Sequence, residues 1–270
     1  MPRRAEVVLL GLVQGPAELL PVSSSGHVAV LPWLLGWSWA DADPEIRKSI
    51  EVALHTGTAA ALLVGLRGEV SDAVAGLDAR RAGLVAWSFL PPAIAGLAFE
   101  RIVEERLGTP PTIAAGLLAG SALLVLGDRA AQRRAHADAG WVDGAWLGLA
   151  QAASLMPGVS RNGATLAAAR ARGFRRADAN VLSRHAALPV IAGASVLKGV
   201  RLVRRGIPAS LAMTLAAGAG ASFASTLASM RLIGLVERDR PLAWWAAYRC
   251  LAASVILAVH SGRRGTVAPG

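Results

Sequence analysis

The feature that most constrains this chain is a series of apolar runs, several of which are too short to cross a membrane. The runs span residues 5–22, 28–40, 52–66, 83–99, 110–127, 145–159, 186–200, 207–230 and 241–259. A spanning helix needs roughly 20 mostly apolar residues. Apolar residues make up 54% of the 270 residues and charged residues only 17%, which is more apolar than an ordinary soluble domain. The sequence therefore predicts an all-α, polytopic integral membrane protein.

The formal net charge of +10 does not indicate a nucleic-acid-binding protein. The arginines are dispersed over short connections between apolar runs, as pairs at 80–81, 133–134, 175–176 and 204–205. In membrane proteins, such loop arginines set orientation and contact anionic lipid headgroups. We therefore expect no nucleic-acid partner.

The chain repeats itself at a shift of 137 positions. The segment GLVQGPAELLPVSSSG (11–26) aligns without gaps with GLAQAASLMPGVSRNG (148–163), with identities that include glycine, glutamine and serine. Each copy is an apolar helix that stops near a proline, opens into a polar loop and re-enters an apolar run. Short, interrupted segments at corresponding places in two halves are typical of inverted repeats with broken helices. We predict one transmembrane domain (1–270) with two inverted repeats, about 1–136 and 137–270, each carrying a broken, re-entrant helix hairpin.

The first loop carries the residues of an anion site. Ser23, Ser24, Ser25 and Gly26 can direct hydroxyl and backbone N–H donors at one anion, and the following helix adds the positive end of its dipole. His27 follows at the start of that helix. The plainer alternative is that the serines and glycine form a flexible turn.

The second loop has the same design with an added arginine. Arg161 offers a planar fork of donors suited to phosphate, and placing it among apolar helices costs roughly 2.5–3.5 kcal/mol even on the mildest scale. It therefore needs a partner, either an internal carboxylate or a bound anion. The neighbouring candidates for substrate binding are Ser160, Asn162, Gly163 and Thr165. A connecting turn with a snorkelling arginine is the plainer alternative.

Among the internal carboxylates, Glu18 is the best candidate for the partner of this arginine. Gln14 and Glu18 are spaced i, i+4, so they share one helix face that leads into the serine loop. They could orient a metal-bound or nucleophilic water, position His27, or form only a helix–helix hydrogen bond. Together with the hydroxyls and Arg161, they have the composition of a phosphoryl-transfer site. His55 and Arg249 also interrupt apolar runs, and Tyr248 fits an interfacial aromatic belt.

The motifs QGPAELLPVSSSGH and PGVSRNGAT, in this order, resemble the two signature motifs of the bacterial undecaprenyl-diphosphatases of the bacitracin-resistance type. The resemblance extends to the apolar segment VALHTGTAAALLVGLR, to LSRHAALPVIAGA and to the YR pair in the last run. It implies a multi-pass enzyme of the bacterial cytoplasmic membrane, with its active site toward the outer face. That enzyme removes the terminal phosphate of undecaprenyl diphosphate and so recycles the lipid carrier of cell-wall precursors. A requirement for a divalent cation is implied as well, Mg²⁺ with Ca²⁺ as the alternative.

Carried over by position, Glu18, Ser24, His27 and Arg161 are the expected catalytic residues. Substrate binding is expected from Ser23, Ser25, Gly26, Ser160, Asn162, Gly163 and Thr165, and metal binding from Glu18 and Gln14. The chain departs from the family pattern at Asn162, where serine is common, and at Gln14, where a second glutamate is common. The second change puts a metal held by two carboxylates in doubt.

The sequence therefore predicts a membrane phosphatase that acts on a polyprenyl diphosphate, either as a single chain or as a homodimer. Arg161 and the loop donors would grip the diphosphate, while Glu18 and His27 would activate either water or Ser24. A transporter or flippase for an anionic lipid or phosphate is the alternative, because inverted repeats with an anion-holding arginine also describe a carrier.

Overall fold

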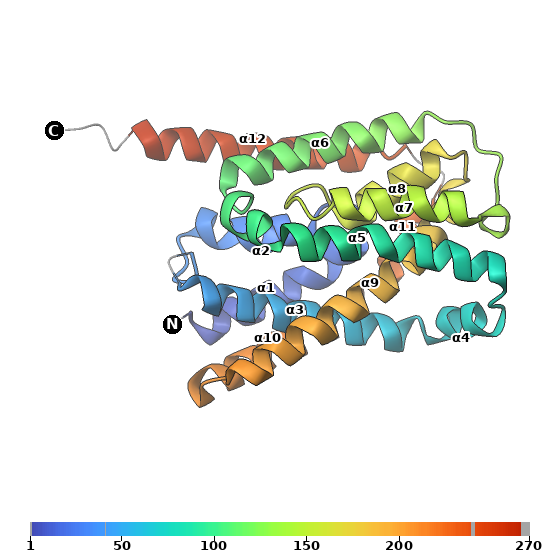
Figure 1. The fold of residues 1–270 in the computed structure, drawn as a ribbon. Coiled ribbons are helices and arrows are strands. Elements are labelled where there is room, and N and C mark those ends of the chain that lie inside the picture. Colours follow the sequence, from blue (N-terminus) through green and yellow to red (C-terminus); the bar gives the residue numbers. More distant parts are fainter. Residues whose placement is uncertain (1, 41, 239–240, 266–270) are drawn as a thin grey trace.

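The computed structural model describes residues 2–40, 42–238 and 241–265, and within these ranges the chain is helical without β-strands. Figure 1 shows most of the long helices lying roughly along one direction. The α-helices are α1 (Arg4–Leu19), α2 (Ser24–Leu35), α3 (Pro44–Gly65), α4 (Arg67–Ala75), α5 (Ala79–Arg106), α6 (Pro110–Asp128), α7 (Trp141–Ala153), α8 (Arg161–Ala171), α9 (Arg176–Arg205), α10 (Ala209–Ser229), α11 (Ile233–Glu237) and α12 (Ala243–Gly265). Two short 3₁₀ turns, η1 (His136–Asp138) and η2 (Met230–Leu232), complete the elements.

Five stretches of helix among the described residues are long and apolar enough to cross a membrane. They are α5, α6, α9, α12 and the stretch from α10 through α11. The helices α3 and α4 meet at a bend of 67° and form a sixth candidate if they are counted as one broken span. The prediction of an all-helical, multi-pass membrane protein is thus confirmed at the level of element type and hydropathy.

Two pairs of shorter helices occupy the segments for which broken hairpins are predicted. Helices α1 and α2 have 16 and 12 residues, and α7 and α8 have 13 and 11, so three of the four fall well short of a span. Pro21 and Pro157 lie in the two intervening loops, where a proline cannot continue the helix that precedes it. The loops then turn sharply at Ser23 and Ser160, whose φ angles are 77° and 68°.

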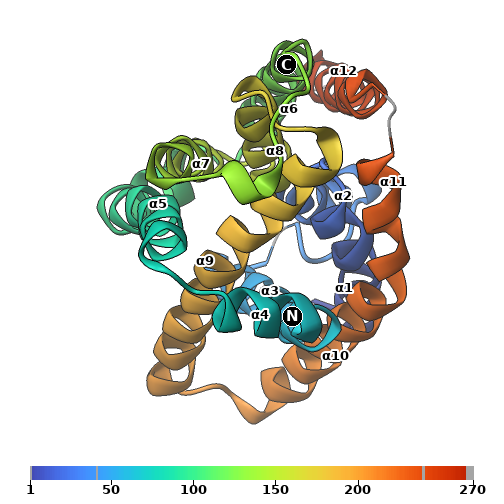
Figure 2. The same ribbon diagram turned by 90° about the vertical axis from the view of Figure 1, so that its right-hand side faces the viewer.

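The order of elements in the two halves corresponds at the repeat shift of 137 residues. The helices α1, α2, α3 and α6 fall on α7, α8, α9 and α12. In Figure 2 helix α1 lies beside α10, helix α7 beside α5, and α6 beside α12. Four helices of the first half therefore have counterparts at matching places in the second half. The inverted relation between the halves stays a prediction.

Glycines let the first helix of each hairpin approach its neighbour closely. A Cβ on Gly11 would lie 2.7 Å from the carbonyl oxygen of Gly218 in α10, and one on Gly148 would lie 2.3 Å from that of Trp87 in α5. Helix packing in membranes depends on such small residues, because van der Waals contact replaces the hydrophobic driving force. The two glycines are equivalent by the repeat, so both hairpins are anchored by the same device.

The connection between the halves is fixed by ion pairs around Asp143 at the start of α7. Arg134 and Arg172 both donate to its carboxylate at 2.8–2.9 Å, and the backbone N–H of Gly140 donates at 3.0 Å. Burial alone would raise the pKa of Asp143, but these donors outweigh it and lower the pKa to about 2. The junction between the two predicted repeats is therefore an ordered ionic cluster.

Candidate active site

The two loops meet at an ion pair between Glu18 at the end of α1 and Arg161 at the start of α8. The side chain of Glu18 is 8% exposed and that of Arg161 is 22% exposed, so water screens this pair only weakly. Of the two partners that the sequence allowed for Arg161, the structure supplies the internal carboxylate. The residues lie 143 positions apart, and the hairpins bring them together.

Two further donors converge on the carboxylate of Glu18. Ser24 Oγ donates to Oε2 at 2.6 Å, and Gln14 Nε2 reaches the same oxygen at 3.3 Å. The Gln14 contact is the predicted i, i+4 pairing on one face of α1. Glu18 is thereby held ionised and oriented, with one oxygen facing Arg161 and the other facing the serine loop.

Ser23 and Ser160 have the same role in the two loops. Each sits before a helix with positive φ, and its hydroxyl accepts a hydrogen bond from the backbone N–H of a glycine three residues on. The distances are 3.3 Å to Gly26 and 3.1 Å to Gly163. These serines therefore act as N-caps that shape the loops. Substrate binding by the four residues stays a prediction.

Arg249 of α12 ties the two loops together. It is fully buried, and its guanidinium donates to the carbonyl oxygens of Gly158 at 3.0 Å and Val159 at 2.8 Å in the second loop. A third bond of 3.3 Å reaches the carbonyl oxygen of Pro21 in the first loop. A carbonyl in a turn has no helical partner, so these bonds satisfy groups that would otherwise be buried without one.

His27 is held on both ring nitrogens. Nδ1 lies 2.7 Å from the carbonyl oxygen of Ser23, which can only accept, and Nε2 lies 2.6 Å from the hydroxyl of Tyr248. The two rings are stacked at 5.8 Å with an interplanar angle of 4°. A neutral His27 therefore carries its proton on Nδ1 and accepts from Tyr248. Its predicted part in activating the attacking group stays a prediction and requires Tyr248 to release Nε2.

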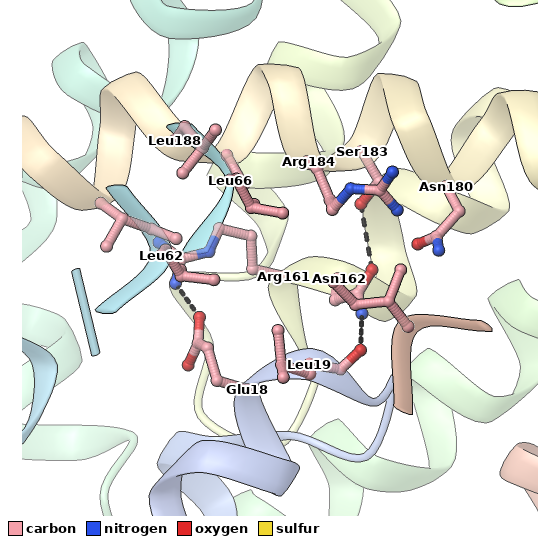
Figure 3. Close-up of a pocket in the computed structure, with 13 residues that line it drawn as sticks. Glu18, Leu19, Leu62, Leu66, Arg161, Asn162, Asn180, Ser183, Arg184 and Leu188 are labelled. Carbon is pink, nitrogen blue, oxygen red and sulfur yellow. Dashed lines mark hydrogen bonds and ion pairs between the residues drawn. The ribbon is translucent and has the colours of Figure 1, made fainter. Parts of the chain in front are cut away.

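Asn162 and Thr165 connect α8 to its surroundings. Asn162 Nδ2 donates to the carbonyl oxygen of Leu19 at 2.8 Å, and its Oδ1 accepts from Ser183 Oγ at 3.0 Å, as Figure 3 shows. Thr165 Oγ1 is buried and lies 2.5 Å from Ser183 Oγ. Both side chains thus lock the hairpin helices to each other and to α9.

A large cavity of about 760 Å³ opens beside the ion pair. Most of its wall is contributed by α2, α3, α5, α6 and α9. The predicted site residues that line it are Glu18, Ser24, Ser25, Ser160, Arg161 and Asn162. Gln14, Ser23, Gly26, His27, Gly163 and Thr165 are not among its lining residues. Its wall combines apolar side chains of α2, α6 and α9 with charged ones, which include Glu45, Arg47, Lys48, Glu51 and Lys198. Such a mixed cavity, with the Glu18–Arg161 pair in its lining, suits an amphiphile with an anionic headgroup.

The residues around Glu18 can hold a divalent cation only with help from a substrate. No cluster of three or more His, Cys, Asp or Glu side chains is placed to share an ion within the described ranges. The buried Oε1 of Gln14, however, has no hydrogen-bond partner there, while Nε2 of the same amide donates to Glu18 Oε2 at 3.3 Å. Mg²⁺ is commonly bound by one or two carboxylates, with phosphate oxygens and water completing its shell. Glu18 and Gln14 fit such a partial set.

Several site residues were not singled out from the sequence. Tyr248 was assigned to an interfacial belt but contacts His27, and Arg249 was noted only as an interruption of an apolar run. Ser183 and Arg184 lie in the segment LSRHAALPVIAGA, which the resemblance includes without assigning either residue a role. A polar side chain within an apolar run was the available indication in each case.

Comparison with known proteins places these motifs in a family. Residues 7–255 match the family model described as bacitracin resistance protein BacA. An undecaprenyl-diphosphatase of Geobacter sulfurreducens is 40% identical over 266 residues, which cover 93% of this chain and 96% of that protein. Relatives with the same name are 37% identical in Geobacter metallireducens, covering 92% and 95% of the two chains, and 33% identical in Thermomicrobium roseum, covering 96% and 99%.

Proposed function

This chain belongs to the bacitracin resistance protein BacA family, and from this premise we propose that it is an undecaprenyl-diphosphate phosphatase. It hydrolyses the terminal phosphate of undecaprenyl diphosphate to give undecaprenyl phosphate and inorganic phosphate. The relatives that bear this name match this chain over almost their whole length, so we propose the complete activity for it and not that of a fragment. This reaction recycles the lipid carrier for cell-wall synthesis.

The observation that carries the proposal is the position of the Glu18–Arg161 pair in the lining of a large cavity whose wall also contains apolar side chains of α2, α6 and α9. An isoprenyl chain fits such side chains, and a diphosphate needs charge-assisted donors beside them. Arg161 uses Nη2 for Glu18 and has further N–H donors with which to hold phosphate oxygens. A headgroup at this point would lie within reach of both loops.

We assign the chemistry to the residues around Glu18. Arg161, together with the donors of the two loops, stabilises the charge that develops on the terminal phosphoryl group. Ser24 donates to Glu18 at 2.6 Å, which is the arrangement of a nucleophile and its base, while water oriented by Glu18 is the other possible nucleophile. Arg249 and Tyr248 position the loops and His27.

We further propose that Glu18 and Gln14 hold Mg²⁺, or Ca²⁺, together with the diphosphate. The orphaned amide oxygen of Gln14, whose amide nitrogen donates to the carboxylate, supports this assignment. The cation would neutralise part of the diphosphate charge. Chelation should then abolish turnover, and titration of Mg²⁺ into the purified protein with a bound diphosphate should restore it.

We also propose that the protein lies in the cytoplasmic membrane with its cavity open to the outer face, and that its halves are inverted repeats. Two equivalent hairpins, with serine caps of the same geometry in both loops, support the repeat. The resemblance of the two motifs supports the orientation. Labelling of single cysteines placed at Lys198 and Arg133, in a variant without Cys250, tests it in intact cells.

The direct test of function is phosphate release from undecaprenyl diphosphate by the purified protein in detergent. We expect release that requires a divalent cation and depends on Glu18 and Arg161. A well-folded protein that releases no phosphate with any divalent ion, but moves the lipid across vesicle membranes, would favour the carrier instead. The Glu18 carboxylate in the lining of the cavity favours the enzyme, because a carrier has less need of a general base beside its anion.

A further inference from the structure

A second, smaller chamber lies against the same ion pair. It has a volume of about 40 Å³ and shares Glu18, Arg161, Asn162 and Ile191 with the large cavity. Its other lining residues are mostly apolar side chains, with Asn180, Ser183 and Arg184 of α9 as the polar members. Figure 3 shows these side chains gathered around Arg161 and Asn162, with Arg184 and Asn180 farther along α9.

The chamber and the large cavity follow one another along the same two helices. On α9, Lys198 and Ala194 line the large cavity, whereas Ala187 and Asn180 line the chamber. On α3, residues 44–55 contribute to the large cavity and residues 62–66 to the chamber. At 1.5 Å per residue, the lining stretch of α9 from 180 to 198 is about 27 Å long. The Glu18–Arg161 pair thus separates two spaces that extend in opposite directions.

The chamber suits water rather than any part of a lipid. A water molecule needs roughly 10–15 Å³ of such space and two to four polar partners, so a volume of about 40 Å³ holds only a few. Glu18, Asn162 and Ser183 provide acceptors and donors around it. The chamber ends near Arg184, which is paired with Glu69 at 3.1 Å and with Glu237 at 2.8 Å.

The position of the chamber matters because phosphoryl transfer is an in-line displacement. The attacking and leaving oxygens lie on opposite sides of the phosphorus. The leaving oxygen carries the isoprenyl chain, which the chamber is too small to admit and which must therefore occupy the large cavity. Ser24 lines the large cavity and not the chamber, whereas Glu18 and Arg161 line both. A nucleophile held in the chamber would therefore approach the phosphorus past Glu18, from the side opposite the isoprenyl chain.

We propose that the chamber holds the water that attacks the terminal phosphorus, so that hydrolysis is a single displacement without a phosphoserine intermediate. The inference rests on the proposed function and names its nucleophile. The water oxygen bonds to phosphorus as the bond to the bridging oxygen breaks, and undecaprenyl phosphate leaves with that electron pair. One water proton passes to the carboxylate of Glu18, which lines both spaces. Ser24 keeps Glu18 oriented and remains unmodified.

The stereochemistry at phosphorus tests this directly. A polyprenyl diphosphate made chiral at its terminal phosphorus with sulfur and a heavy oxygen isotope is hydrolysed in water that carries a third oxygen isotope. One displacement inverts the configuration of the released thiophosphate, and a phosphoserine route retains it. Inversion is the expected result, and retention would overturn the proposal while leaving the phosphatase activity established. A protein that releases no phosphate from the unmodified diphosphate would instead contradict the proposed function.

A pair of matched variants on α9 tests the role of the chamber itself. Ala187→Leu fills the chamber, and Ala194→Leu adds the same group to the large cavity two turns away. We expect Ala187→Leu to lower kcat roughly tenfold or more, with little change in KM, because the attacking water is displaced. Ala194→Leu should mainly raise KM. Unchanged kcat in a folded Ala187→Leu protein, or a loss that appears only in KM, would contradict the assignment.

Enlarging the chamber gives a readout that altered packing alone would not produce. Leu188→Ala should let methanol compete with water as the acceptor, so that methyl phosphate forms beside inorganic phosphate. We expect its share of product to rise several-fold over wild type, whereas Ala194→Gly should leave it unchanged. An equal share in wild type and Leu188→Ala would show that the acceptor does not come from the chamber.

Discussion

Replacement of Arg249 by methionine should loosen the site by separating its two loops. The methionine side chain fills much of the buried space but cannot donate to the carbonyl oxygens of Gly158, Val159 and Pro21. A hydrogen bond to a charged group is worth roughly 1.5–3 kcal/mol, and the 3.3 Å bond to Pro21 counts least. Two strong bonds and their orphaned acceptors give a destabilisation of about 3–5 kcal/mol.

For a chain of this size, that loss corresponds to a fall in Tm of about 5–10 °C. Displacement of the loops by about 1 Å should also lower kcat/KM roughly 100-fold, because catalysis depends on their alignment. Thermal unfolding in detergent and phosphate release would be measured on the same preparations. Arg67→Met, at an exposed position, is the control and should match wild type. An Arg249→Met protein with wild-type Tm and turnover would refute the reasoning.

Three further predictions concern single side chains. Arg161→Lys keeps the charge but loses the planar fork, so kcat/KM for phosphate release should fall roughly 100-fold; near-normal turnover would remove Arg161 from the site. Tyr248→Phe removes the donor to His27 Nε2 and should lower kcat about tenfold without changing Tm, so a pure loss of stability would argue against a positioning role. The pKa of Asp143 is lowered to about 2, below its unfolded value of roughly 3.9. Its ionised carboxylate therefore stabilises the folded state above about pH 4, and this stabilisation is lost as the pH falls through 2. Asp143→Asn should therefore remove about 1–2 kcal/mol at neutral pH, allowing for solvent screening, and flatten the fall in Tm over that window; an unchanged acid profile would contradict this.

The helix hairpins could be predicted because prolines and apolar run lengths are local properties of the sequence. Pro21 and Pro157 lie two and four residues beyond the ends of α1 and α7, and the repeat shift of 137 predicts the positions of α7 and α8 from those of α1 and α2. Hydropathy located the spans that α5, α6 and α9 occupy. The 67° bend between α3 and α4 falls where the apolar run 52–66 ends, but the end of a run does not by itself predict that a second helix follows at an angle.

The core of the site could be predicted because an arginine among apolar helices requires a partner. Glu18 is the candidate partner that the sequence offers, and the structure pairs it with Arg161. The contacts of Tyr248 and Arg249 depend on how α12 packs against both loops, which is a property of tertiary structure and leaves no local pattern. The chamber beside Arg184 likewise depends on the packing of α3, α9 and α11.

The central claim is that Glu18 of the first loop and Arg161 of the second form one hydrolytic site. A double-mutant cycle on phosphate release tests it most directly, with wild type, Glu18→Gln, Arg161→Ala and the double variant assayed at saturating Mg²⁺. Residues that act as a unit are strongly non-additive, so the double variant should be no slower than the slower single variant. Losses that multiply, or a Glu18→Gln protein with normal turnover, would contradict the account.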